Sequence, residues 1–122
     1  MAKNIMIVDD SASLRQVVSI ALKSAGYDVV EACDGKEALT KLDGRKLHLI
    51  ISDVNMPNMD GISFVKAAKL LPAYKFTPVI MLTTEASEAR KKEGQAAGAR
   101  AWVVKPFQPA QMLTAVSKLV LP

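Results

Sequence analysis

Five residues of this 122-residue sequence have side chains suited to binding a divalent metal ion and a phosphoryl group. They lie at the ends of short apolar runs: Asp9, Asp10, Asp53, Thr83 and Lys105. Carboxylate oxygens are ligands that Mg²⁺ accepts, while a hydroxyl and an ammonium can hydrogen-bond to phosphoryl oxygens. Three carboxylates held close together repel one another unless a cation lies between them. If the fold gathers these residues, they predict a site for one divalent cation and one phosphoryl group.

The apolar runs are predicted to be strands that alternate with helices. Strands are expected at 5–8, around 29–30, and at 47–52, 79–82 and 101–104, and helices at 14–25, 36–42, 62–71, 88–97 and 109–121. Strict alternation predicts an α/β fold in which helices cover both faces of a parallel sheet. The central strands are apolar throughout, as expected for strands covered on both faces. Because parallel strands end at one edge of the sheet, the five side chains are expected to converge there.

The first helix should have a clear cap and a clear polar face. Ser11 and Ser13 are candidate caps near its start, and Gly26 ends it. Its polar face is expected to consist of Arg15, Gln16, Ser19 and Lys23. At the other end of the chain, Pro109 is placed to begin the last helix.

Composition excludes several classes of protein. Half of the residues are apolar and 23% are charged, which predicts one packed domain. The net charge of +4 comes from scattered lysines and arginines, with one cluster at 90–92, and no nucleic-acid-binding motif accompanies it. Nucleic-acid binding is therefore not expected. No apolar run is long enough for a signal peptide or a membrane span, so a cytoplasmic location without membrane association is expected.

The single cysteine and the single histidine are predicted to be structural. Cys33 has no second cysteine with which to form a disulfide or a metal cluster, and it is expected to be a small buried residue near the end of a strand. His48 precedes or begins the third strand, at the wrong end of the sheet for the site, so an edge or surface imidazole is expected. Asp53 is the better phosphoryl acceptor, because carboxylates can form aspartyl phosphates.

Four motifs in order resemble a known family over nearly the whole chain. They are Asp9-Asp10, the segment 53–61 (DVNMPNMDG), Thr83-Thr84-Glu85 and Lys105-Pro106-Phe107, and each follows a predicted strand. The sequence resembles the receiver domains of two-component response regulators, and most closely stand-alone chemotaxis proteins of the CheY type. The resemblance implies a single flavodoxin-like (βα)5 domain over 1–122, without an output domain. It also implies the strand order 2-1-3-4-5 known from CheY.

The resemblance also implies a metal site and a reaction. Asp53 would accept the phosphoryl group from the phosphohistidine of a sensor histidine kinase. Mg²⁺, with Mn²⁺ as an alternative, would be held by Asp10, Asp53 and the backbone carbonyl of Asn55. Asp9 would act through a water molecule. Lys105 would contact the phosphoryl oxygens.

A switch is implied as well. Thr83 would hydrogen-bond to the phosphoryl group, and Trp102 stands where the family carries a Tyr, Phe or His that moves with this hydroxyl residue. A cis Lys105–Pro106 peptide is expected. Asn55 and Glu85 would influence the rate of dephosphorylation.

The implied output surface is formed by the helix at 88–97, the strand at 101–104 and the helix at 109–121. The basic run Arg90-Lys91-Lys92 would attract an acidic partner segment. The sparsely charged last helix could contact a target or a second copy, so a monomer or a phosphorylation-dependent dimer is expected.

Alternative functions remain open at this point. A phosphorelay intermediate would pass the phosphoryl group on to another histidine protein. A phosphatase of the haloacid-dehalogenase type would need a second acid two positions after the nucleophile, where this chain has Asn55. Asn55 therefore favours a switch that catalyses only its own phosphoryl transfer and slow autodephosphorylation. A DNA-binding regulator would need an output domain that these residues lack.

Overall fold

The computed structural model describes residues 3–84 and 88–120, with the side chains of 88–90 outside the description. The strands are β1 (Asn4–Val8), β2 (Asp28–Ala32), β3 (Leu49–Asp53), β4 (Val79–Thr83) and β5 (Ala101–Val104). The helices are α1 (Ala12–Ser24), α2 (Gly35–Lys41), α3 (Gly61–Lys69), α4 (Glu88–Ala97) and α5 (Pro109–Leu119), with a 3-10 turn at Pro72–Tyr74. Strands and helices alternate as predicted.

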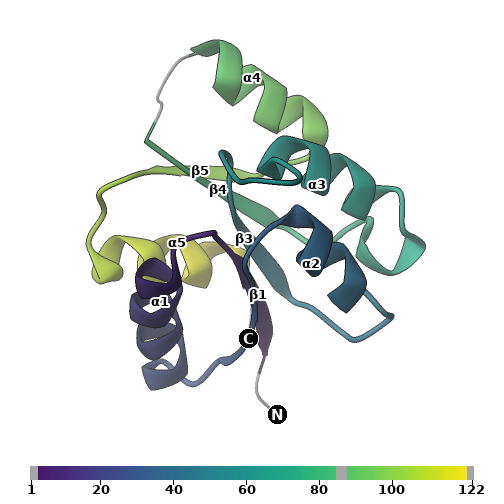
Figure 1. Cartoon of the computed structure of the whole chain (residues 1–122). Coiled ribbons are helices and arrows are strands. Elements are labelled where there is room, and N and C mark those ends of the chain that lie inside the picture. The colour runs from purple at the N-terminus through teal and green to yellow at the C-terminus, as the bar shows by residue number, and fades with distance from the viewer. Residues whose placement is uncertain (1–2, 85–87, 121–122) are drawn as a thin grey trace.

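The strands form one parallel sheet in the order β2-β1-β3-β4-β5. Helices α1 and α5 cover one face, and α2, α3 and α4 cover the other (Figure 1). Successive side chains of a strand point to opposite faces, so β1 contributes to two cores. Ile5 and Ile7 pack with α1 and α5, whereas Met6 and Val8 pack on the opposite face. The predicted flavodoxin-like fold is confirmed.

The third strand begins later than the sequence pattern predicts. It was expected at 47–52 but occupies Leu49–Asp53, so that Asp53 is its last residue and pairs in register with Leu82 of β4. His48 lies just before the strand and is partly buried, with Nδ1 accepting a hydrogen bond from the Asn4 backbone N–H at 3.0 Å. The histidine is therefore at the amino-terminal edge of the sheet, away from the strand ends that carry the acids.

Of the two residues predicted as possible caps of α1, one is confirmed. Ser11 is the N-cap, because its hydroxyl accepts the Leu14 backbone N–H at 3.2 Å, whereas Ser13 lies inside the helix. The predicted polar face was wrong at Ser19, which is 3% exposed, while Ile20 is 59% exposed. Helical spacing alone does not decide which flank of the buried Val18 is covered, and here the flank with Ser19 is buried while the flank with Ile20 is exposed.

The expectation that Cys33 is buried was also wrong, since this residue is exposed. Ala32 ends the edge strand β2 and is buried, and Cys33 follows it into the turn before α2. There its backbone N–H donates to Oε1 of Glu37 at 2.6 Å. No helix among the described residues is both long and apolar enough to cross a bilayer.

Candidate functional site

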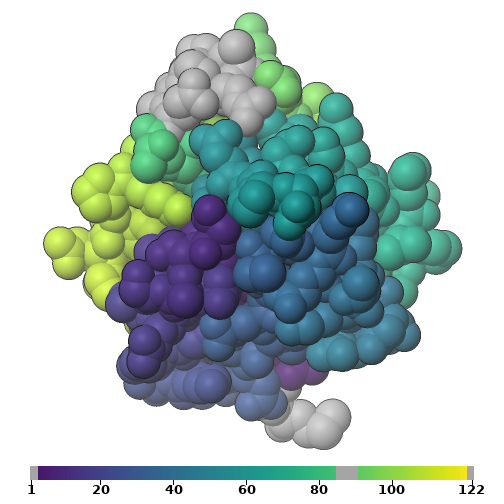
Figure 2. Space-filling view, viewed as in Figure 1, coloured from purple at the N-terminus to yellow at the C-terminus, as the bar shows by residue number. Residues whose placement is uncertain are grey.

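The predicted site residues lie at the carboxyl-terminal edge of the sheet. Asp53 and Thr83 are the last residues of β3 and β4, Asp9 directly follows β1, and Lys105 directly follows β5. In the space-filling view, the purple segment after β1, the teal segment after β3 and the yellow-green segment after β5 meet on the face turned to the viewer (Figure 2). The fold therefore joins parts of the chain that are far apart in sequence.

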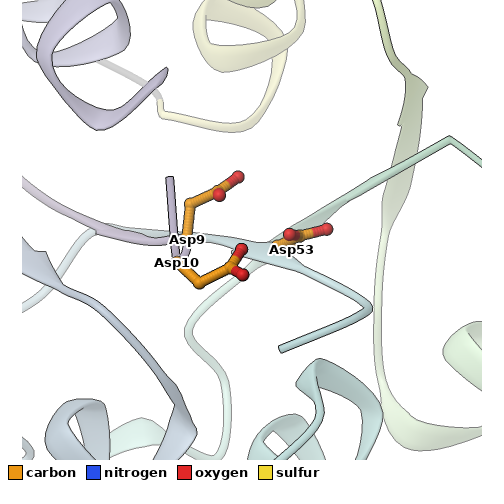
Figure 3. Close-up of side chains that lie close together, drawn as sticks. All are labelled: Asp9, Asp10 and Asp53. Carbon is orange, nitrogen blue, oxygen red and sulfur yellow. The ribbon is translucent and has the colours of Figure 1, made fainter. Parts of the chain in front are cut away.

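Three carboxylates gather at this edge. One oxygen each of Asp9, Asp10 and Asp53 lies within 4.8 Å of the others. Figure 3 shows Asp9 and Asp10 branching from one segment, with the Asp53 side chain next to them at the end of the neighbouring strand. Asp9 is 0% exposed and Asp53 is 6% exposed, whereas Asp10 is exposed. The cluster is thus buried on one side and open to solvent on the other.

Lys105 is the cation of the cluster. Its Nζ lies 2.9 Å from Oδ2 of Asp9 and 3.3 Å from Oδ2 of Asp53. Burial lowers the pKa of Lys105, but the hydrogen bond to Asp9 and the charges of both carboxylates outweigh that effect and raise it. Lys105 is therefore charged, and three carboxylates less one ammonium leave two negative charges.

Burial, followed by the charge of Asp9, raises the pKa of Asp53, and Lys105 offsets only part of this rise. Asp9 is already engaged, since Oδ1 accepts the Ser11 N–H at 2.9 Å while Oδ2 accepts from Lys105. A divalent cation beside Asp10 and Asp53 would neutralise the remaining charge, and the open side leaves room for water ligands. Hard oxygen donors with retained water are what Mg²⁺ requires, so the donor set fits this ion.

The loop after β3 turns back onto the strand. The Gly61 N–H donates to the Val54 carbonyl at 2.8 Å. A Cβ at Gly61 would lie 1.8 Å from the Asp53 carbonyl oxygen, so only glycine fits there. Asn58 has a positive φ of 67°, and its Nδ2–H donates to Oδ2 of Asp34, the N-cap of α2, at 2.7 Å. The loop that contains Asn55 is thus tied to α2.

The other predicted site residues lie at or near the ends of β3, β4 and β5. The Thr83 side chain is buried, and its carbonyl accepts the Lys105 backbone N–H at 2.7 Å. The Lys105–Pro106 peptide is cis, as expected from the sequence. Asn55 is exposed in the loop after β3, and Trp102 is partly buried on β5. Glu85 lies outside the described residues.

Comparisons with known proteins agree with this geometry. A family model described as the response regulator receiver domain matches residues 5–117. The chain belongs to the response regulator receiver domain family. Receiver domains are phosphorylation-activated signalling switches of two-component systems, and they work with histidine kinases and downstream targets.

Similar proteins include several chemotaxis proteins. The chain is 39% identical to chemotaxis protein CheY1 of Helicobacter pylori over 119 residues, which is 96% of this chain and 95% of that protein. It is 35% identical to protein PilG of Pseudomonas aeruginosa, over 92% of this chain and 83% of that one. The crystal structure of chemotaxis protein CheY4 of Vibrio cholerae superposes with a TM-score of 0.94 at 50% identity, covering 98% of this chain and 99% of that one.

One contact of this receiver domain was missed by sequence reasoning. Arg15 was placed on the polar face of the first helix, yet its Nη1 donates to the backbone carbonyl of Asp9 at 2.5 Å. The available signal was position, since Arg15 lies in the first turn after the Ser11 cap and a long side chain there can reach back to the preceding strand end. Helical periodicity assigns faces but does not show this reach.

Proposed function

We propose that Asp53 accepts a phosphoryl group from the phosphohistidine of a sensor histidine kinase in a Mg²⁺-dependent reaction. A carboxylate oxygen of Asp53 bonds to phosphorus as the phosphorus–nitrogen bond breaks, and the histidine nitrogen leaves with the electron pair. The main support is the position of Asp53, which lies at a strand end beside the ammonium of Lys105 and within 4.8 Å of two further carboxylates. Phosphoryl transfer depends mainly on such positioning and charge neutralisation.

The acidic cluster is the proposed metal site. Asp10, Asp53 and the backbone carbonyl of Asn55 would hold Mg²⁺, and Asp9 would act through a water molecule. When bound, the ion would neutralise and orient the phosphoryl oxygens. Mn²⁺ could take its place because it accepts the same oxygen donors.

Lys105 and Thr83 are the proposed contacts of the phosphoryl group. The Lys105 ammonium already lies 3.3 Å from Oδ2 of Asp53, so it is placed to bind an oxygen of a group attached to that carboxylate. The Thr83 hydroxyl would donate a hydrogen bond to a second oxygen. Trp102 would respond to this change from the neighbouring strand, where it pairs in register with Met81.

The phosphorylated state should persist long enough to signal. Asn55 stands two positions after Asp53, and its amide cannot donate or accept a proton in catalysis at neutral pH. We therefore propose that Asn55 and Glu85 set a slow rate of dephosphorylation, and that the protein is a switch, not a phosphatase.

The proposed output is a change in the surface formed by α4, β5 and α5, which would bind a protein target. Lys91 and Lys92 on α4 favour a partner with acidic side chains, since opposite charges speed association. The similarity to CheY1 and CheY4 supports a chemotaxis pathway. Target binding would involve a monomer or a dimer formed on phosphorylation.

The test uses acetyl phosphate as donor and Trp102, the only tryptophan, as reporter. Fluorescence should change on addition of Mg²⁺ and again on addition of acetyl phosphate, while intact mass increases by one phosphoryl group. Asp53→Asn should abolish the mass increase and the second fluorescence step. Phosphorylation of Asp53→Asn at the wild-type level would disprove the assignment. Rapid multiple turnover of p-nitrophenyl phosphate by the wild type would instead identify a phosphatase.

A further inference from the structure

The guanidinium of Arg15 donates hydrogen bonds to two partners, and one of them is the backbone of Asp9 in the acidic cluster. Its Nη1 donates to the Asp9 carbonyl at 2.5 Å, and its Nε donates to Oε1 of Glu31 on β2 at 3.2 Å. The Arg15 side chain is 18% exposed, so solvent reaches little of it. One guanidinium therefore joins the first turn of α1, the edge strand β2 and the end of β1.

These contacts complete the hydrogen bonding of Asp9. Its N–H donates to the Ala32 carbonyl at 3.1 Å, and its two carboxylate oxygens accept from the Ser11 N–H and from Lys105. The Asp9 carbonyl belongs to the peptide unit that leads into Asp10. Fixing that carbonyl fixes the plane of the peptide, and with it the point from which the Asp10 side chain projects.

The contacts of Arg15 go beyond a surface ion pair with Glu31. Exposed pairs contribute about 0–1 kcal/mol, and Glu31 is 43% exposed on its side of the pair. The Asp9 carbonyl, by contrast, accepts from a charged donor next to a fully buried carboxylate. The planar guanidinium can serve the carbonyl and the Glu31 carboxylate at the same time because its donors form a fixed fork.

We infer that Arg15 is a positioning residue for the divalent-cation site, which holds the Asp9–Asp10 peptide so that the Asp10 carboxylate faces Asp53. This inference rests on the proposed Mg²⁺-dependent function. When Arg15 is replaced by an uncharged residue, the positioning role and simple electrostatics predict opposite changes in Mg²⁺ affinity. Removing a positive charge near a cation site should strengthen Mg²⁺ binding by Coulomb's law, whereas loss of positioning should weaken it.

The experiment is a calorimetric titration of the metal-free protein with MgCl₂ at fixed ionic strength. Arg15→Met removes the charge but keeps an apolar side chain of similar length. Arg15→Lys keeps the charge but loses the planar guanidinium that can donate to two partners at once. Arg15→Met is expected to bind Mg²⁺ about tenfold more weakly, the lower end of the effect seen when side chains that orient metal ligands are removed. Arg15→Lys should fall between Arg15→Met and the wild type.

Arg45→Met is the matched control. Arg45 pairs with Asp43 in an exposed loop, so this variant removes the same charge away from the site and should leave Mg²⁺ affinity unchanged. If the wild type binds Mg²⁺ and Arg15→Met binds it as tightly or more tightly, the positioning role is overturned while the proposed function stands. If Arg15→Met does not fold, Arg15→Lys decides, because wild-type affinity in that variant overturns the inference. A wild type that takes up no Mg²⁺ would overturn both proposals.

Discussion

The indole of Trp102 packs directly against Gly94 of α4. A Cβ added at Gly94 would lie 2.4 Å from Cζ3 of the ring, so the ring fills the space that a side chain would occupy. The Trp102 Nε1 atom is buried and has no hydrogen-bond partner among the described residues. The indole is therefore held by packing and not by a hydrogen bond of Nε1. The position of the ring depends on the position of α4.

Gly94→Ala should displace the indole. Alanine favours a helix over glycine by about 1 kcal/mol, but overpacking costs about 1–3 kcal/mol, so we expect a net loss of about 1 kcal/mol in the free energy of unfolding. Tryptophan emission should shift to longer wavelength and be quenched more readily by acrylamide. Lys92→Ala, on the same helix but exposed, should leave the emission unchanged. An unaltered spectrum for Gly94→Ala would contradict the packing described.

Asp53→Asn should stabilise the protein when metal is absent. Burial and the charge of Asp9 raise the pKa of Asp53 above 3.8, so the folded state binds the proton more readily than the unfolded chain. The stability due to this carboxyl therefore decreases as pH rises through 3.8 to the folded pKa, and it stays reduced at neutral pH. Urea unfolding in EDTA should show a higher midpoint for Asp53→Asn at pH 7, and the difference should shrink as pH approaches 4. Saturating Mg²⁺ should reduce or reverse the difference, because ligand binding stabilises the wild type more. A variant less stable than wild type in EDTA would contradict this account.

Asn58 should be sensitive both to backbone conformation and to loss of its amide. Its φ of 67° disfavours residues with a Cβ, and its amide bonds to the Asp34 carboxylate. Asn58→Gly keeps the conformation accessible and loses the hydrogen bond, whereas Asn58→Ala also adds a backbone cost of about 1–2 kcal/mol. We expect Asn58→Ala to be the less stable of the two by about 1 kcal/mol in urea unfolding. Equal stability of the two variants would show that the positive φ is not maintained in solution.

His48 should make stability depend on pH between neutrality and mild acid. Burial, then the charges of Lys3 and Lys46, lowers its pKa from 6.5, and its Nδ1 must be unprotonated to accept the Asn4 N–H. The unfolded chain then binds the proton more readily, so this contribution is present above pH 6.5 and is lost as pH falls toward the folded pKa. His48→Asn should lose less stability than wild type between pH 7 and pH 5, measured by urea unfolding. Parallel losses in both proteins would exclude His48 as the source.

Sequence patterns were informative where the determinants are local. Apolar runs predicted the strands, Ser11 predicted the start of α1, and Pro109 predicted the start of α5. The convergence of Asp9 and Asp53 followed from one rule, that parallel strands end at the same edge. These features depend on neighbouring residues and on chain direction, which the sequence contains directly.

The tertiary structure decided which faces are covered and which distant side chains touch. Ser19 is buried on a helix face that periodicity assigned to solvent, and the ammonium of Lys105 contacts Asp9 across 96 positions of sequence. The sequence predicted Arg15 on the polar face of the first helix, whereas the structure places the Asp9 carbonyl and the Glu31 carboxylate against its guanidinium. By itself, the sequence determined the strands, the helices and the chemical groups at the strand ends. Which groups are held in place, and by which partners, was decided only by packing, because those contacts join elements whose spacing no local pattern encodes.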